Sequence, residues 1–182
     1  MIETRRLCIR NFQEEDWQAV HAYSTDPEVV RFVPGELPSE EETRDAIRSW
    51  MNGQTDNPPH YDFAVTVPPD DFVIGWCCIQ ISSSDKRLGE LMYVFNRNFW
   101  KKGYAIEATQ AIVNYGFSEL KLHRIFATCR PENMGSWRIL EKLGMQREGL
   151  LRENIWIRGS WYSSYLYAIV DYEWEARMNR WF

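Results

Sequence analysis

The chain has 182 residues, of which 45% are hydrophobic and 26% are charged, and its formal net charge is −5. This length allows one domain with a hydrophobic core and hardly allows two, so we expect a single domain over residues 1–182. The acidic balance argues against broad nucleic-acid binding, which needs a basic face. The longest apolar run, 72–81, is too short to span a bilayer.

Hydrophobic periodicity and turn residues predict the elements of the first half of the chain. Strands are expected at 4–12, 61–67, 72–81 and 88–95, helices at 13–23 and 39–51, and a short turn or helix at 28–32. Ser39 and Glu42 form an S-x-x-E capping box, which predicts the start of the second helix. The run Pro68-Pro69-Asp70-Asp71 predicts a hairpin turn between two strands.

The second half continues with helices and strands of similar length. A helix is expected from about 104 to 120, because apolar residues recur there at three- and four-residue spacing. A strand at 123–130, a helix at 134–143 and strands at 145–157 and 160–174 follow, with Gly144 as the stop of the helix. The predicted fold is a mixed α/β sheet of about seven strands, mostly antiparallel, with helices on both faces.

The hexapeptide Trp100-Lys101-Lys102-Gly103-Tyr104-Ala105 connects a strand to a helix. Free backbone N–H groups and the positive end of a helix can hold a pyrophosphate at such a turn, and a glycine lets the ligand approach closely. A capped turn with its lysines in solvent explains the same residues. The segment is neither a dinucleotide fingerprint, which needs three glycines, nor a Walker A loop.

Three further residues are candidates for a site. Glu90 is the only charge in an apolar strand, where its pKa should rise and suit a general base, although a strand-edge glutamate in solvent is the plain alternative. Asn133 either caps the helix that follows it or reaches a ligand beside that helix, and Ser136 lies in the first turn.

The cysteines show neither C-x-x-C spacing nor a histidine at zinc-finger distance. We therefore expect reduced thiols, no metal site and a cytoplasmic location. The N-terminus has no apolar stretch typical of a signal peptide.

Three stretches in order, L-G-E-L-M-Y-V-F, W-K-K-G-Y-A-I-E-A and R-P-E-N-M-G-S-W-R-I-L-E-K-L-G-M, resemble the GNAT superfamily of acyl-CoA-dependent N-acetyltransferases. The resemblance extends from T-R-R-L-C-I-R to R-G-S-W-Y and is closest to the branch that acetylates the N-terminal amine of ribosomal proteins.

The resemblance implies roles for individual residues. Cofactor binding would fall on the strand end, the phosphate-binding turn and the residue before the later helix: Val94, Phe95, Trp100, Lys101, Lys102, Gly103, Tyr104, Ala105 and Asn133. Lys101 stands where this branch often has glycine. Many members have a tyrosine acid where this chain has Leu140, and Ser136 fits the serine that this branch uses instead. Glu90 and Ser136 are then the expected catalytic base and acid.

The resemblance implies transfer of acetyl from acetyl-CoA to a primary amine, with a protein or peptide N-terminal α-amine as the favoured acceptor. Acetylation of a polyamine or antibiotic, a non-catalytic acyl-CoA sensor, and a structural domain that uses its tryptophans stay open as alternatives. We expect no nucleic-acid or membrane partner and a monomer or homodimer. Trp174 and Trp181 are expected to be exposed near an interface.

Overall fold

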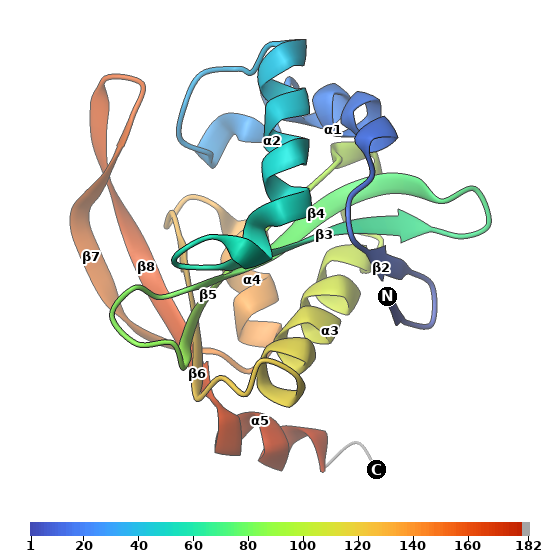
Figure 1. Cartoon of the computed structure of the whole chain (residues 1–182). Coiled ribbons are helices and arrows are strands. Elements are labelled where there is room, and N and C mark those ends of the chain that lie inside the picture. Colours follow the sequence, from blue (N-terminus) through green and yellow to red (C-terminus); the bar gives the residue numbers. More distant parts are fainter. Residues whose placement is uncertain (180–182) are drawn as a thin grey trace.

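The computed structural model describes residues 1–179 and places helices on both faces of one open sheet (Figure 1). The strands are Ile2–Glu3 (β1), Cys8–Arg10 (β2), His60–Val67 (β3), Phe72–Ile81 (β4), Leu88–Phe95 (β5), Arg124–Cys129 (β6), Gln146–Ile157 (β7) and Ser160–Val170 (β8). The α-helices are Trp17–Ser24 (α1), Glu40–Asn52 (α2), Tyr104–Ser118 (α3), Met134–Lys142 (α4) and Asp171–Met178 (α5). Short 3-10 helices are Glu14–Asp16 (η1), Val30–Phe32 (η2), Gly53–Thr55 (η3) and Arg97–Phe99 (η4).

The sheet order is β1-β2-β3-β4-β5-β6-β8-β7, and among the described residues only β5 and β6 pair in parallel. The predicted α/β class and mostly antiparallel sheet are therefore confirmed. The sheet has eight strands where about seven were expected, because β1 lies ahead of the expected strand at 4–12, and only Cys8–Arg10 of that expected strand forms β2. The N–H of Thr4 donates to the carbonyl of Leu7 at 2.9 Å, and this turn separates the two-residue β1 from β2.

Alternation along the central strands sorts side chains into two cores. Leu91 and Phe95 of β5 lie in the core beneath α3 and α4, whereas Val94 packs into a second core with α1 and α2. Successive side chains of a strand point to opposite faces, which accounts for this division of β5. The two cores explain why Figure 1 shows α1 and α2 on one side of the sheet and α3 and α4 on the other.

The predicted helix signals at Ser39 and Gly144 are confirmed. The hydroxyl of Ser39 accepts the N–H of Glu42 at 3.2 Å, and the Glu42 carboxylate accepts the N–H of Ser39 at 2.8 Å, which forms the capping box of α2. Gly144 ends α4 with a φ of 86°, in the left-handed region that favours glycine.

The chain beyond Val170 differs from its prediction. The expected strand to 174 ends at Val170, and α5 begins at Asp171. The carboxylate of Glu173 accepts the N–H of Val170 at 3.1 Å and starts this helix. Trp174 was expected to be exposed, but it is only 3% exposed and packs in the core. Trp181 lies outside the described residues.

No helix within residues 1–179 has the length and apolar character needed to cross a membrane.

Candidate active site

A gap in the middle of the sheet positions the site. β5 and β6 pair only from Leu88 opposite Arg124 to Glu90 opposite Phe126. β5 continues to Phe95 and β6 continues to Cys129 without further pairing to each other, while each remains paired to its outer neighbour. One edge of β5 is therefore open inside the sheet, beginning immediately after Glu90.

The alternation of backbone hydrogen bonds along β5 identifies which backbone groups face this gap. The N–H of Asn96 donates to Ile74 of β4 at 2.9 Å. In an antiparallel pair, alternate residues bond to the same neighbour, so the backbone groups of Val94 also point toward β4. The backbone groups of Leu91, Tyr93 and Phe95 point toward the gap. Of the two residues predicted at the strand end, Phe95 therefore has its backbone groups toward the gap and Val94 does not, whereas Tyr93 does.

The turn between β5 and α3 has the conformation that a phosphate-binding loop needs. Lys101 has a φ of 60° and Gly103 a φ of 82°, both in the left-handed region. Lys101 thus adopts a glycine-like conformation at the position where the resembling branch often has glycine. The first amide of α3 to bond back is that of Glu107, to the carbonyl of Gly103 at 3.2 Å. Within residues 1–179, the amides of Tyr104 and Ala105 are left without a helical acceptor.

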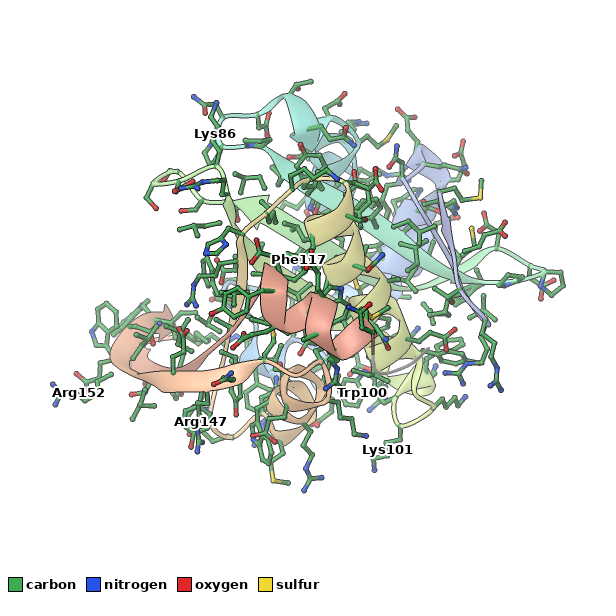
Figure 2. The ribbon with its side chains drawn as sticks, turned by 90° about the horizontal axis from the view of Figure 1, so that it is seen from below. Lys86, Trp100, Lys101, Phe117, Arg147 and Arg152 are labelled. Carbon is green, nitrogen blue, oxygen red and sulfur yellow. The ribbon has the colours of Figure 1, made fainter. Side chains whose placement is uncertain are left out.

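The side chains of this turn divide between packing and solvent. The indole of Trp100 donates to the carbonyl of Phe95 at 2.7 Å and ties the turn to the end of β5. Lys101 and Lys102 are exposed, and Figure 2 shows Lys101 directed away from the ribbon. The turn therefore offers free amides beside two cations in an otherwise acidic protein.

The N-terminal segment supports this turn through side-chain contacts that no sequence pattern predicted. Glu107 of α3 accepts hydrogen bonds from the Thr4 hydroxyl at 2.7 Å and from the Arg6 Nε at 2.7 Å. Arg6 also donates to the carbonyl of Lys102 at 2.9 Å and lies over the ring of Tyr104. Burial alone would raise the pKa of Glu107, but the bonds from Thr4 and Arg6 outweigh it and lower that pKa.

Glu90 lies on the face of β5 that carries α1 and α2. It is partly buried, and the hydroxyl of Thr128 on β6 donates to it at 3.4 Å. Burial raises the pKa of Glu90 above the ordinary value, more than the Thr128 bond lowers it. Its carboxylate therefore sits where the gap opens and is better suited to accept a proton than a solvated glutamate.

Ser136 approaches the same gap from the opposite face. Its hydroxyl lies 2.9 Å from the hydroxyl of Tyr93, which also donates to the carbonyl of Ser136 at 3.2 Å. Asn133 caps α4 by accepting the N–H of Ser136 at 3.1 Å, which is the capping alternative for this residue. Tyr93 was not predicted as a site residue, although the alternation along β5 already placed it on the face opposite Glu90.

Each of the three histidines has a side-chain partner on another element or loop. His21 bonds to the Thr43 hydroxyl at 2.9 Å, and His123 pairs with Asp171 at 3.1 Å. His60 bonds to Asp62 and lies 2.9 Å from Asp56. Within residues 1–179 there is no group of three His, Cys, Asp or Glu side chains that could hold a metal ion.

The open strand edge and the amide-rich turn together are suited to an extended, phosphate-bearing ligand. Residues 6–146 match the family model described as an acetyltransferase (GNAT) domain. The chain is 40% identical over 173 residues to the uncharacterized N-acetyltransferase YnaD of Bacillus subtilis, covering 95% of this chain and 98% of YnaD.

Solved structures agree. A GNAT-family acetyltransferase from Bacillus anthracis shares 38% identity and a TM-score of 0.86, with 94% of this chain and 99% of that chain covered. At 20% identity, a ribosomal-protein-S5-alanine acetyltransferase from Vibrio fischeri shares the fold with a TM-score of 0.82, with 95% of this chain and 97% of that chain covered. The chain belongs to the GNAT family of N-acetyltransferases. It is an acetyltransferase that uses acetyl-CoA as co-substrate.

Proposed function

We propose that this enzyme transfers the acetyl group of acetyl-CoA directly to the N-terminal α-amine of a protein or peptide. The observation that carries the proposal is the gap between β5 and β6, which has Glu90 on one face and Ser136 on the other. The acceptor amine enters from the face of α1 and α2, and the coenzyme lies along the open edge of β5. The two substrates then meet at the level of Glu90.

The residues of the turn and the strand edge hold the coenzyme. The amides of Tyr104 and Ala105, with Lys101 and Lys102 nearby, suit its diphosphate. The open backbone groups of Tyr93 and the N–H of Phe95 pair with the amides of its arm in the manner of a short strand, while the carbonyl of Phe95 keeps its bond from Trp100. An N–H on this edge also stabilises the oxyanion that forms at the thioester carbonyl.

Glu90 provides the first proton transfer. An α-amine has a pKa of about 8, so much of it is protonated at neutral pH and cannot attack. Glu90 accepts this proton directly or through water, after which a carbon–nitrogen bond forms, the carbon–sulfur bond breaks, and the second proton of the amine passes to the departing thiolate or to solvent. In this step the Tyr93 hydroxyl donates to the Ser136 hydroxyl, which donates its own proton in a hydrogen bond to the leaving sulfur. That sulfur needs only modest help, because a thiol has a pKa of about 8.5.

Direct attack is favoured over a covalent enzyme intermediate. Cys129 is the cysteine of β6, and burial raises the pKa of its thiol to about 11. The thiolate and not the thiol is the nucleophile, so Cys129 is inactive near neutral pH. We also infer a cytoplasmic location, where free thiols such as Cys77, Cys78 and Cys129 stay reduced.

The test is release of coenzyme A thiol from acetyl-CoA in the presence of Ala- and Ser-starting peptides, polyamines and aminoglycosides. The proposal predicts release with peptides and a mass gain of one acetyl group on the peptide α-amine. Release with only polyamines or aminoglycosides would replace the peptide by a small-molecule acceptor. Acetyl-CoA binding with no release on any amine would show an acyl-CoA sensor.

A further inference from the structure

The side chain of Arg130 is held between two aromatic rings. Its guanidinium carbon lies 3.5 Å from the ring centroid of Tyr162 on β8 and 5.4 Å from that of Phe32 in η2. The side chain is only 13% exposed. Stacking of this kind fixes the plane of the guanidinium, so its donors point in set directions.

The guanidinium of Arg130 has one partly exposed ion-pair partner and one buried nitrogen without a hydrogen bond among residues 1–179. Its Nε is buried and makes no hydrogen bond within residues 1–179. Arg130 forms an ion pair with Glu132, whose carboxylate oxygen lies 3.3 Å from Nε, but this contact makes no hydrogen bond and the Glu132 side chain is 60% exposed. Buried polar groups in proteins are nearly always hydrogen-bonded, so the buried Nε of Arg130 calls for an acceptor.

Two more arginines gather at the same place. Arg31 also lies over the ring of Phe32, with its guanidinium carbon 5.3 Å from the ring centroid. Arg158, in the β7–β8 turn, donates to the carbonyl of Val30 at 3.4 Å. Arg31 and Arg158 have no carboxylate within salt-bridge distance in the described part of the chain. We call Arg31, Arg130 and Arg158 the η2 arginine cluster, a local positive field on a chain of net charge −5.

The η2 arginine cluster is on the acceptor side of the sheet. Along β6, Ala127 and Cys129 are buried in the core beneath α3 and α4, while Thr128 bonds to Glu90 on the other face. Arg130 continues the alternation on the Glu90 side. It lies four residues beyond Phe126, the partner of Glu90, which is about 13 Å along an extended strand.

We propose that Arg130 is an anion subsite for the acceptor, and that it binds a carboxylate near the N-terminus of the acceptor peptide. The inference rests on the proposed function. With the α-amine at Glu90, two or three extended residues of about 3.5 Å each, together with the length of the arginine, span the distance to Arg130. An aspartate or glutamate at the second to fourth position of the peptide fits this spacing. Its carboxylate supplies the paired acceptor that the guanidinium fork lacks.

The test compares the full-length enzyme on peptides that start with Ala or Ser and carry either Glu or the isosteric Gln at positions two, three and four. At the best position, Glu should raise kcat/KM over Gln by about 10- to 100-fold, as expected for a charge-assisted hydrogen bond. In Arg130→Gln this Glu-to-Gln ratio should fall to near one. Arg130→Lys keeps the charge without the planar fork and should retain part of the ratio.

The matched control is Arg152→Gln, which removes the same charge from an exposed position of β7 that points away from the ribbon in Figure 2. This variant should keep the ratio of the wild type. A ratio that survives in Arg130→Gln, or equal kcat/KM for Glu and Gln peptides in the wild type, overturns the anion subsite alone. If the wild type acetylates no peptide of either kind, the proposed function fails and this inference fails with it.

Discussion

At the residue scale, Glu90 has the chemistry most open to measurement. Its raised pKa means that it binds a proton at a higher pH than a solvated glutamate does. A base must be unprotonated to act, so kcat/KM should rise with pH through this pKa. The acid limb of the pH profile should therefore lie above the ordinary glutamate value of about 4.3.

Glu90→Gln should slow turnover by about 10²–10⁴-fold and remove that acid limb, because the amide neither accepts the proton nor titrates. The measurement is kcat/KM against pH for both proteins with acetyl-CoA saturating. An unchanged acid limb in Glu90→Gln would assign the limb to another group.

Tyr93 and Ser136 should act as one unit. Ser136→Ala should slow turnover by about 10²–10⁴-fold if the hydroxyl acts as an acid and less if it only donates a hydrogen bond. Tyr93→Phe keeps the packed ring and removes the hydroxyl that lies 2.9 Å from Ser136. Because Tyr93 works through Ser136, the double variant should be no slower than Ser136→Ala.

Single-turnover acetylation rates measure this coupling. Tyr165→Phe is the control, since it removes a hydroxyl from the same core without touching Ser136. Multiplication of the two single effects in the double variant would show that Tyr93 and Ser136 act separately.

At the element scale, the turn before α3 depends on a carboxylate from inside that helix. Glu107→Gln should destabilise the protein at neutral pH by about 1–3 kcal/mol, the range for hydrogen bonds to charged groups. It should also weaken acetyl-CoA binding, because Arg6 then no longer holds the carbonyl of Lys102 in place.

The lowered pKa of Glu107 determines how its contribution to the free energy of unfolding changes with pH. Its contribution to stability is complete above the unfolded value of about 4.3 and is lost as pH falls through the lower folded value. The difference in stability between the wild type and Glu107→Gln should therefore disappear in acid, as followed by thermal melts. Glu175→Gln, at an exposed position, is the control. A stability difference that is constant from neutral pH into the acid range would exclude the ionised carboxylate as its source.

Elements with their own local signal could be predicted from sequence. The capping box at Ser39 and the turn at Gly144 marked helix ends, and alternation marked the faces of β5. The prediction of a strand to 174 was wrong because the apolar residues Val170 and Trp174 fit the pattern of a strand and of a helix alike. The acidic residues Asp171 and Glu173, in the first turn of α5, were the available signal for a helix start.

At the scale of the whole molecule, the fold class could be predicted, but the site only in part. The gap between β5 and β6 depends on which strands become neighbours, and no local pattern states where their pairing stops. The family resemblance supplied the turn and Glu90, and only the folded strand shows that Tyr93, and not Val94, has its backbone groups toward the gap. The stacked Arg130 joins segments more than a hundred residues apart, so periodicity could not reveal it.

The most direct measurement is the crystal structure of this protein with coenzyme A bound. We predict the diphosphate on the amides between Trp100 and Ala105, the arm of the coenzyme along Tyr93 and Phe95, and the sulfur in the gap near Ser136. A coenzyme bound elsewhere, with that turn empty and β5 uncovered, would contradict the account.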